Sequence, residues 1–431
     1  MSAPENAHYI APDQLRIGLF IHLDMSWLHH PFSFSSFKIK TDAQIQTLRS
    51  LKLKRIRYDP DRSDVPPYPH QAEPKEDAPA NTPQPTVTAE EDSPALAAKR
   101  ERIEKLRQHR EELAQIQKAY LEAAETMRSI NKKLQVNPAT ATEEIEQFVA
   151  QMVDTFLNKA DITLQAMGGN KENTEIYFHA LNVSILCLML AKGLGLSAED
   201  SHHLGIGALL HDIGLMQIPD RILRKIEPLT QAENNLRKMH CEYGMNVGVT
   251  MGLSKPVLQI IAQHHEMLDG SGYPKGLKGG LIHPLARIVA VVNHYDNLCN
   301  PVDIDKALTP HEALSYMFAQ ARSRFDAKVL QLLVRSLGVY PPGTIVRLSN
   351  DAIALVASVN PQKPLRPWLV VYDADTPADE AIMLNLDQES DINISKALRP
   401  GQLPPEVVEY LNPRKRVTYY FDSSSEMGAQ P

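Results

Sequence analysis

Residues Ala208-Leu209-Leu210-His211-Asp212-Ile213-Gly214 form an apolar run that ends in an imidazole beside a carboxylate. Burying a polar group without a partner costs roughly 2–7 kcal/mol even when the group is neutral. His211 and Asp212 therefore need a partner, and a metal ion would satisfy both side chains. A second stretch, His264 to Pro274 (HHEMLDGSGYP), adds two adjacent imidazoles, and histidine is the commonest metal ligand.

Further candidate ligands lie before, between and after these two stretches. Glu175 and His179 are four residues apart in a helical pattern, so both would lie on one face of a helix. The set exceeds what one ion needs, and a nitrogen and oxygen set without thiolate suits iron or manganese. A carboxylate shared by two ions would create a two-metal site of the kind that hydrolyses phosphodiesters. The complete set is Glu175, His179, His211, Asp212, His240, His264, His265 and Asn293.

The histidines and the Asp269-Gly270…Gly272-Tyr273-Pro274 segment resemble the signature of the HD-GYP family in spacing and order. This resemblance implies an all-helical bundle with metal ions at its centre. It also implies a bacterial signalling enzyme that linearises cyclic di-GMP to pGpG, and in some members continues to GMP. The predicted catalytic residues are His211 and Asp212.

The resemblance also assigns the ligands. It implies that His179, His211 and Asp212 follow the general HD pattern, that His240, His264 and His265 hold a second ion, and that Glu175 allows a third. The expected cofactors are thus two or three divalent transition-metal ions, iron or manganese. The expected substrate-binding residues are Gly272, Tyr273, Pro274, Lys275 and Lys306.

Three positions depart from the family pattern. Leu215 and Val302 stand where the family has Lys and Arg, and Asn293 stands where it has a ligating Asp. Two cations that would face phosphate are missing, and one charged ligand is neutral. An alternative reading is therefore a catalytically degenerate module that senses cyclic di-GMP or binds proteins. A third reading is an HD enzyme that acts on another nucleotide.

Composition restricts the class of protein. The chain has 431 residues, enough for two to four domains, and a net charge of −7. This charge argues against duplex nucleic acid as a partner, because that binding depends on many Lys and Arg contacts to phosphate. The three cysteines are unpatterned, which indicates a reduced, cytoplasmic protein. No apolar stretch approaches the ~20 residues that a membrane span requires.

The order of patterns predicts a mainly α, multidomain chain. Residues 1–62 indicate a small α/β domain, with Ile17, Leu19 and Ile21 on one strand face and Thr41 capping a helix. The segment from Ser26 to Phe37 resembles a domain of unknown function that is often fused to HD-GYP modules. Within it, His29-His30 are expected to be surface loop residues.

The later segments differ in composition. Residues 63–96 form a proline-rich linker, and residues 97–135 form a charged helix that either dimerises or packs on its own domain. Residues 140–340 form the all-helical catalytic domain, and residues 341–421 are β-rich. Protein partners would bind through the Gly-Tyr-Pro loop or the N-terminal domain.

Other residues of the catalytic segment have less certain roles. Asp269 to Pro274 cannot be helical, and its backbone N–H groups could meet a phosphate or guanine, or it could be a purely structural turn. Glu266 and Asp296 are candidates to orient imidazoles from outside the ligand set. The doublet His202-His203 lies among acidic residues at an expected helix start and is not expected to bind metal.

Overall fold

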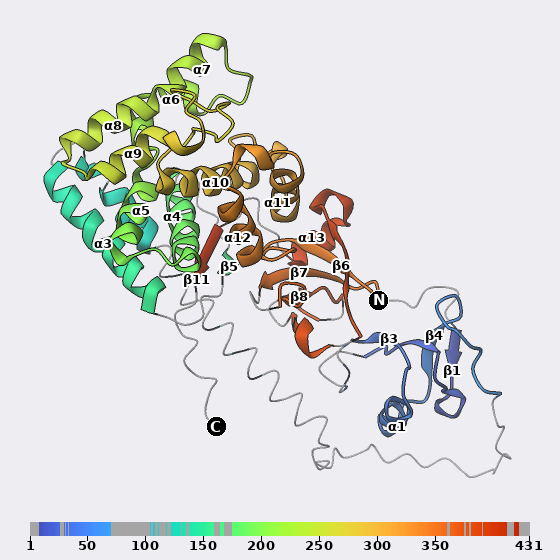
Figure 1. Cartoon of the computed structure of the whole chain (residues 1–431). Helices are drawn as coiled ribbons and strands as arrows, with labels where there is room; N and C mark the ends of the chain where they lie inside the picture. Colours follow the sequence, from blue (N-terminus) through green and yellow to red (C-terminus); the bar gives the residue numbers. More distant parts are fainter. Residues whose placement is uncertain are drawn as a thin grey trace. The chain divides into compact units, whose positions relative to one another are not determined.

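The computed structural model describes most of the chain, and its parts are treated one at a time (Figure 1). The described residues are 8–25, 30, 32, 34–69, 104, 107, 111, 118, 122–130, 132–134, 138–158, 164–167, 175–359, 363–374, 376–378, 381–389, 391–411 and 418–421.

The N-terminal domain is a four-stranded antiparallel sheet with one helix. The strands have the order β1-β4-β2-β3. Helix α1 (Asp42–Ser50) begins where the sequence predicts, because the Thr41 side chain accepts the Gln44 N–H at 3.3 Å. The strands are β1 (His8–Ile10), β2 (Phe20–His22), β3 (Ser36–Lys38) and β4 (Ile56–Asp59).

Two local expectations for this domain are wrong. Leu19 and Ile21 are fully buried, but Ile17 is 45% exposed. Gly18 has a φ of +97°, so the chain turns there and the alternation of the strand begins only afterwards. His30 is buried rather than on the surface, and its Nε2 lies 3.1 Å from Ser35 Oγ. Position 29 lies outside the described residues.

The domain extends into the segment expected to be linker. The Asp64 N–H donates to the Gly18 carbonyl at 2.9 Å, and the Tyr68 N–H donates to the Gln14 carbonyl at 3.0 Å. These main-chain hydrogen bonds hold residues 64–68 against the sheet. The remainder of the proline-rich segment lies outside the described residues.

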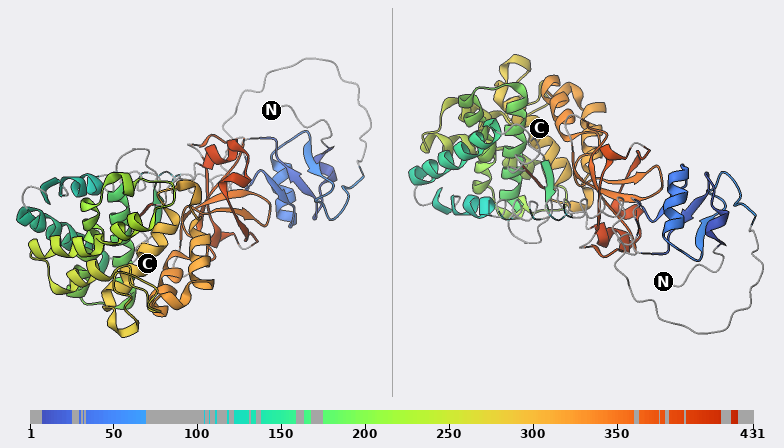
Figure 2. Two further views of the ribbon diagram at one scale, coloured as in Figure 1. Left: turned by 90° about the horizontal axis from the view of Figure 1, so that it is seen from above. Right: turned by 90° about the horizontal axis from the view of Figure 1, so that it is seen from below.

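The central part of the chain is a bundle of helices, as predicted. Both views of Figure 2 show these helices packed together. Short 3₁₀ turns connect several of them. The helices are α3 (Pro138–Asn158), α4 (Glu175–Leu194), α5 (Ala198–Leu210), α6 (Asp220–Leu223), α7 (Gln231–Lys238), α8 (His240–Thr250), α9 (Lys255–Gln263), α10 (Pro284–Cys299), α11 (Pro310–Ala319) and α12 (Ala327–Leu337).

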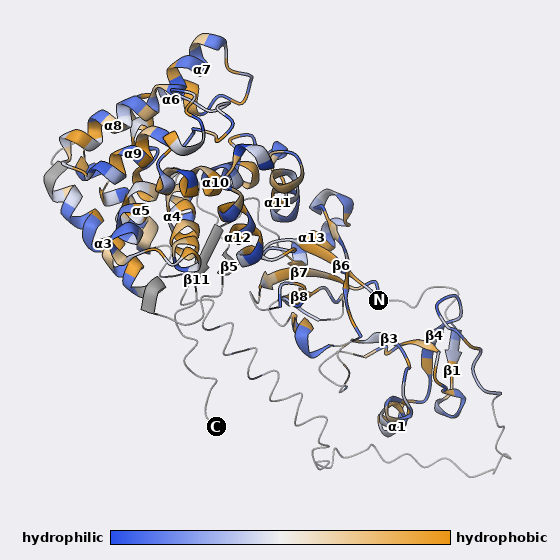
Figure 3. Cartoon of the chain, viewed as in Figure 1, coloured by the Kyte–Doolittle hydropathy of each residue, from blue (hydrophilic) through white to orange (hydrophobic). Residues whose placement is uncertain are grey.

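Helix α4 lies at the centre of this bundle. It is apolar along most of its length, whereas α3 and α8 alternate apolar and polar residues (Figure 3). Helices α3, α5, α10 and α12 pack on it. A helix that is apolar on all sides is stable only where other helices cover every face, so the side chains of α4 point into the core of the bundle.

Part of the charged segment before α3 also belongs to this core. Residues 122–130 and 132–134 are helical, and Ala124, Met127, Ile130 and Leu134 are buried in the same apolar cluster as α4. This stretch therefore packs on its own domain. Most of residues 97–121 lie outside the described residues, so the dimerising alternative for them stays a prediction.

The C-terminal region is a sheet, as predicted. The order β10-β6-β7-β5-β11 describes the main path, and β8 pairs with β7 and β9. Helix α13 (Pro405–Leu411) buries Val407 and Leu411 on this sheet. The strands are β6 (Ile345–Leu348), β7 (Ile353–Ser358), β8 (Trp368–Val371), β9 (Ile382–Asn385), β10 (Ile394–Leu398) and β11 (Thr418–Phe421).

One strand of the sheet comes from the segment expected to be entirely helical. Strand β5 (Leu164–Met167) lies between α3 and α4 and pairs with β7 and β11. A four-residue strand has almost no periodic signal, and its partners lie far along the chain, so this pairing is a tertiary feature.

Among the described residues, no helix combines the length and the apolar character that crossing a bilayer needs.

Candidate metal centre

Helix α5 carries His211 and Asp212 into the bundle. Its last turns are buried, and it ends at Leu210, so that His211 and Asp212 begin the turn into η3 (Ile213–Gln217). A Cβ on Gly214 would overlap the His240 carbonyl oxygen and the Gly244 nitrogen. Only glycine allows η3 to lie this close to α8, and this contact places Asp212 beside His240.

One group of ligand atoms surrounds Oδ2 of Asp212. His179 Nε2 and His211 Nε2 lie 3.7 and 3.4 Å from this oxygen, and 3.2 Å from each other. The two imidazoles come from α4 and from the end of α5. The three side chains are close enough to hold one metal ion.

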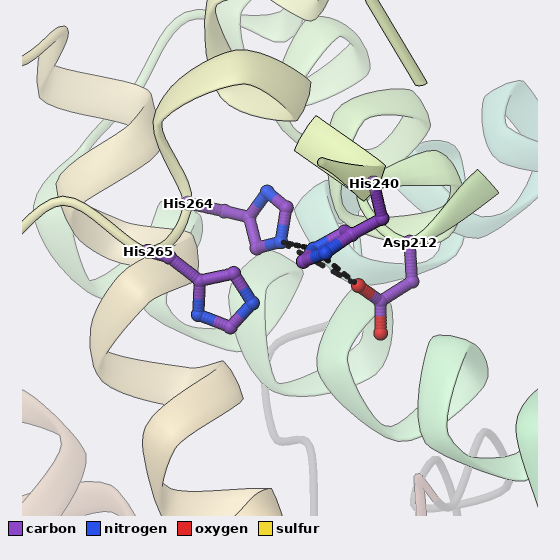
Figure 4. Close-up of side chains that lie close together, drawn as sticks. All are labelled: Asp212, His240, His264 and His265. Carbon is purple, nitrogen blue, oxygen red and sulfur yellow. Dashed lines mark hydrogen bonds and ion pairs between the residues drawn. The ribbon is translucent and has the colours of Figure 1, made fainter. Parts of the chain in front are cut away.

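A second group surrounds the other oxygen of the same carboxylate. His240 Nε2 and His264 Nε2 lie 3.3 and 3.5 Å from Asp212 Oδ1, and 3.1 Å from each other. Figure 4 shows these side chains with His265, which completes the group. Asp212 therefore faces a different set of imidazoles with each of its oxygens, the geometry of a bridging ligand.

The protons on the imidazoles are placed by their outer hydrogen bonds. Nδ1 of His211, His240 and His264 lies 2.7–2.8 Å from the main-chain carbonyl three residues earlier. Nδ1 of His179 lies 2.6 Å from Asp296 Oδ2. Because each Nδ1–H donates outward, Nε2 is the nitrogen of each ring that faces the centre and can offer its lone pair to a metal, as in metal-bound histidines.

The electrostatics of the site favour the ionised form of the Asp212 carboxylate, which is the form that binds metal. Burial would raise the pKa of Asp212, but the charge and hydrogen bonds of the imidazoles, His211 first, hold it well below its usual value. Burial lowers the pKa of His264 to about 4 and the pKa of His265 well below its usual range. A carboxylate with neutral imidazoles is the protonation state that binds metal.

Two imidazoles hold protons more tightly. Burial lowers the pKa of His240, but hydrogen bonds with Asp212 and Cys241 outweigh it and raise the pKa to about 10. Burial also lowers the pKa of His179, but the hydrogen bond and the charge of Asp296 outweigh it, so the pKa of His179 is raised. The short Nε2–Nε2 contacts therefore need a proton or a metal cation between their lone pairs, so the donor set fits divalent ions that displace these protons.

The buried carboxylate of Asp296 supports the first group from outside. It is 1% exposed, and besides His179 it accepts from Asn182 Nδ2 at 2.9 Å and from Asn300 Nδ2 at 3.0 Å. It thus orients an imidazole, as the sequence suggested. Asn182 was not foreseen, because an amide three residues after His179 has no sequence signal of its own.

Asn293 lies beside this group. It is 2% exposed, its side chain contacts His179, and its Oδ1 accepts from Asn297 Nδ2 at 2.6 Å. The neighbouring His294 instead packs on Phe325, with ring centroids 5.1 Å apart. Glu175 begins α4, but its side chain lies outside the described part of the structure.

The Gly-Tyr-Pro loop closes over the second group. Tyr273 stacks on His265 with a centroid separation of 4.4 Å and an interplanar angle of 22°. Glu266 does not orient an imidazole: its carboxylate accepts the Lys275 and Leu277 N–H groups at 2.7 and 2.8 Å and so fixes the loop. A Cβ on Gly272 would overlap the His265 carbonyl oxygen.

The remaining predicted residues lie outside the ligand groups. Pro274 and Lys275 are exposed in the loop. Lys306 pairs with Asp303 at 2.8 Å, and its side chain is 71% exposed. The doublet His202-His203 lies within α5 and belongs to neither group, as expected.

Three family models match successive parts of the chain. Residues 8–145 match a domain of unknown function (DUF3391), residues 155–329 match the HD domain, and residues 345–404 match a KOW domain associated with the HD domain. The first match accords with the resemblance of the N-terminal segment.

Several curated proteins are similar to this chain. Cyclic di-GMP phosphodiesterase PA4108 of Pseudomonas aeruginosa is 29% identical, over 83% of each chain. The cyclic di-GMP phosphodiesterase response regulator RpfG of Xanthomonas campestris is 38% identical, over 34% of this chain and 39% of the relative. The chain thus spans most of the first relative but well under half of the second.

Among solved structures, Bd1817, an HD-GYP-type protein of Bdellovibrio bacteriovorus, aligns with a TM-score of 0.43 and 18% identity, over 76% of this chain and 98% of that one. The HD-domain match contains the residues of both ligand groups and the Gly-Tyr-Pro loop. The central bundle thus matches the HD domain, with a DUF3391 match before it and a match to the HD-associated KOW domain after it, and the chain is similar along most of its length to a cyclic di-GMP phosphodiesterase.

Proposed function

We propose that this chain is a metal-dependent phosphodiesterase that hydrolyses cyclic di-GMP to pGpG, with further hydrolysis to GMP as the alternative end point. The placement of Asp212 carries the proposal, because its two oxygens face two different groups of imidazoles. A bridging carboxylate suits a pair of ions that hold the attacking and leaving oxygens of an in-line displacement at phosphorus. Both relatives are named cyclic di-GMP phosphodiesterases.

The residues of the chain hold and orient the reacting groups. His179, His211 and Asp212 would hold one ion, and His240, His264, His265 and the same Asp212 would hold the other. When bound, a pair of divalent ions supplies Lewis acidity to the phosphoryl oxygens and to water. The outward hydrogen bonds of the Nδ1 atoms keep each imidazole turned toward the centre.

The donor set supports iron or manganese over magnesium. Magnesium prefers oxygen ligands and retains its waters, whereas imidazole suits transition metals. Asn293 would contribute a neutral oxygen to the first ion. A third ion would require Glu175, so two ions are the number that the described side chains support.

The substrate would lie against the loop. Gly272, Tyr273 and Pro274 would contact the nucleotide, with Lys275 at the exposed edge. Lys306 would have to leave its ion pair with Asp303 to reach a phosphate. Protein partners through this loop or the N-terminal domain, and a homodimer, remain proposals. We also propose a cytoplasmic location, since Cys187, Cys241 and Cys299 are all unpaired.

Metal and product analysis together test the proposal. The purified chain should contain iron or manganese, and incubation with cyclic di-GMP should yield pGpG; the product analysis also shows whether GMP follows. A chelator should abolish hydrolysis, and iron or manganese should restore it better than magnesium. A panel with cyclic di-AMP and 3′,3′-cGAMP tests the choice of base. Full activity in metal-free protein, or hydrolysis of another dinucleotide alone, would contradict the proposal. Leu215, Val302 and Asn293 are the residues that motivate the degenerate alternative, and binding of cyclic di-GMP without hydrolysis by the metal-loaded protein would favour it.

A further inference from the structure

We propose that the Lys238 ammonium binds the second phosphodiester of the cyclic dinucleotide, the one that is not being cleaved. Lys238 would then be a substrate-binding residue that selects for two phosphates. This inference rests on the proposed function, because it takes the substrate to be a cyclic dinucleotide whose scissile phosphate lies at the metal centre.

The position of Lys238 is fixed at the edge of the site. It is the last residue of α7, and α8 begins two residues later at the ligand His240. Helix α7 is anchored at its other end, where Glu233 accepts from the Thr230 N–H at 2.7 Å and pairs with Lys225 at 2.7 Å. A helix held at both ends restricts where its last side chain can reach.

The ammonium also lies close to the ligands. Lys238 Nζ is 5.1 Å from the centroid of the Tyr273 ring, a cation–π contact. Tyr273 in turn stacks on the ligand His265 and lies 6.3 Å from the ring of His240. One aromatic ring therefore separates the ammonium from the metal ligands.

The charge of Lys238 is not neutralised within the described residues. Lys225, Lys306 and Lys363 each pair with a carboxylate at 2.7–2.8 Å, whereas Lys238 forms no ion pair with any residue that the structure describes. Its side chain is half-buried. A half-buried cation that has no carboxylate partner and lies beside a metal centre can bind an anionic group of a ligand.

The substrate supplies such a group. A cyclic dinucleotide carries two phosphodiesters on opposite sides of its ring, and the metal ions can neutralise only the one they hold. The positions expected to provide cations do not do so: Leu215 is half-buried and apolar, and Val302 is 48% exposed. Lys275 is exposed in the loop itself, whereas Lys238 is half-buried and lies over the Tyr273 ring, on the side of the ligand His240.

Selectivity between two substrates tests this role. The metal-loaded full chain is assayed on cyclic di-GMP and on bis(p-nitrophenyl) phosphate, which has a single phosphodiester. In Lys238→Met the ratio of kcat/KM for the two substrates should fall about 10- to 100-fold through a higher KM for cyclic di-GMP, the effect of losing a charged hydrogen bond. Lys238→Arg should retain most of the ratio, and the exposed Lys255→Met is the matched control.

Two further measurements separate the possible outcomes. Equal losses on both substrates together with loss of metal would mean a structural role, and an unchanged ratio would mean no role; either overturns the inference. The Kd of cyclic di-GMP for the metal-loaded protein is measured in parallel. If the wild type binds but does not hydrolyse it, the proposed function fails, whereas a similar 10- to 100-fold weaker binding by Lys238→Met would still support the inference. If the wild type does not bind it, both fail.

Discussion

The Nδ1 atom of His179 on α4 lies 2.6 Å from Oδ2 of Asp296 on α10. This hydrogen bond joins two helices of the bundle core, and its acceptor is almost fully buried. It sets the tautomer of His179, so that Nε2 faces Asp212 and His211. The orientation of one metal ligand thus depends on a carboxylate that does not itself face the metal.

We predict that Asp296→Asn weakens retention of one ion by about 10- to 100-fold, because it removes the charged acceptor that orients His179. The measurement is metal content after dialysis against a series of weak chelators. Asp305→Asn, at an exposed position, is the control and should retain metal as the wild type does. Wild-type retention by Asp296→Asn would show that the hydrogen bond is dispensable.

Asp212→Ala should eliminate hydrolysis and lower the content of both ions while the helical bundle persists. The carboxylate contributes to both ligand groups, whereas the fold depends on the apolar helices around it. Circular dichroism, metal analysis and activity are measured together. His202→Ala is the matched control, because it lies on α5 outside both groups and should be nearly neutral. Similar losses from the two substitutions would mean that the ligands are wrongly identified.

Asn293→Asp should increase retention of the ion held by His179 and His211. The change adds a negative charge at nearly constant volume, and a carboxylate is a stronger ligand than an amide oxygen. Its Oδ atoms can still accept from Asn297. Occupancy after dialysis against a weak chelator is the measurement. If occupancy does not change in Asn293→Asp but collapses in His294→Ala, then His294 is the ligand instead.

Gly214→Ala should destabilise the fold by at least about 1–3 kcal/mol, because the new Cβ would overlap backbone atoms of His240 and Gly244 rather than flexible side chains. Separation of η3 from α8 should also reduce the metal content. Denaturant unfolding and metal analysis measure the two effects. Gly280→Ala is the control, since nothing lies within 4 Å of its added Cβ, and equal stability of the two variants would contradict the close approach.

A pH dependence follows from Glu312, which caps α11 and pairs with Arg399 at 2.6 Å. Burial would raise its pKa, but Arg399 and Thr309 lower it below the usual 4.5. A carboxylate whose pKa is lower in the folded than in the unfolded state stabilises the fold at pH values above its unfolded pKa. This stabilisation is lost as the pH falls through the folded pKa. Glu312→Gln should therefore lower the free energy of unfolding at pH 7 by under about 1 kcal/mol, since the pair is partly exposed.

The difference between wild type and Glu312→Gln should shrink as the pH falls below 4.5. Urea unfolding at several pH values measures it, and the exposed Glu406→Gln controls for a general loss of negative charge. A difference that grows toward acid would reverse the sign and contradict this account.

The sequence by itself determined the helical class of the central domain and the candidate ligands. His211 and Asp212 follow an apolar helix, and the doublet His264-His265 precedes a segment that glycine and proline exclude from a helix. These signals are local, since periodicity and turn residues act within a few positions of the chain. They sufficed to nominate the candidate ligands and the Thr41 cap, whereas the division of the ligands into two groups was implied by the resemblance to the HD-GYP family.

The tertiary structure alone decided how these residues meet. Asp212 faces both groups because Gly214 lets η3 approach α8. Glu266 fixes the loop rather than an imidazole, Lys238 lies over Tyr273, and β5 joins a distant sheet. Each depends on residues far apart in sequence or on a side-chain direction, and periodicity encodes neither. The packing of complete helices and strands selects these contacts, so they appear only when the chain is folded.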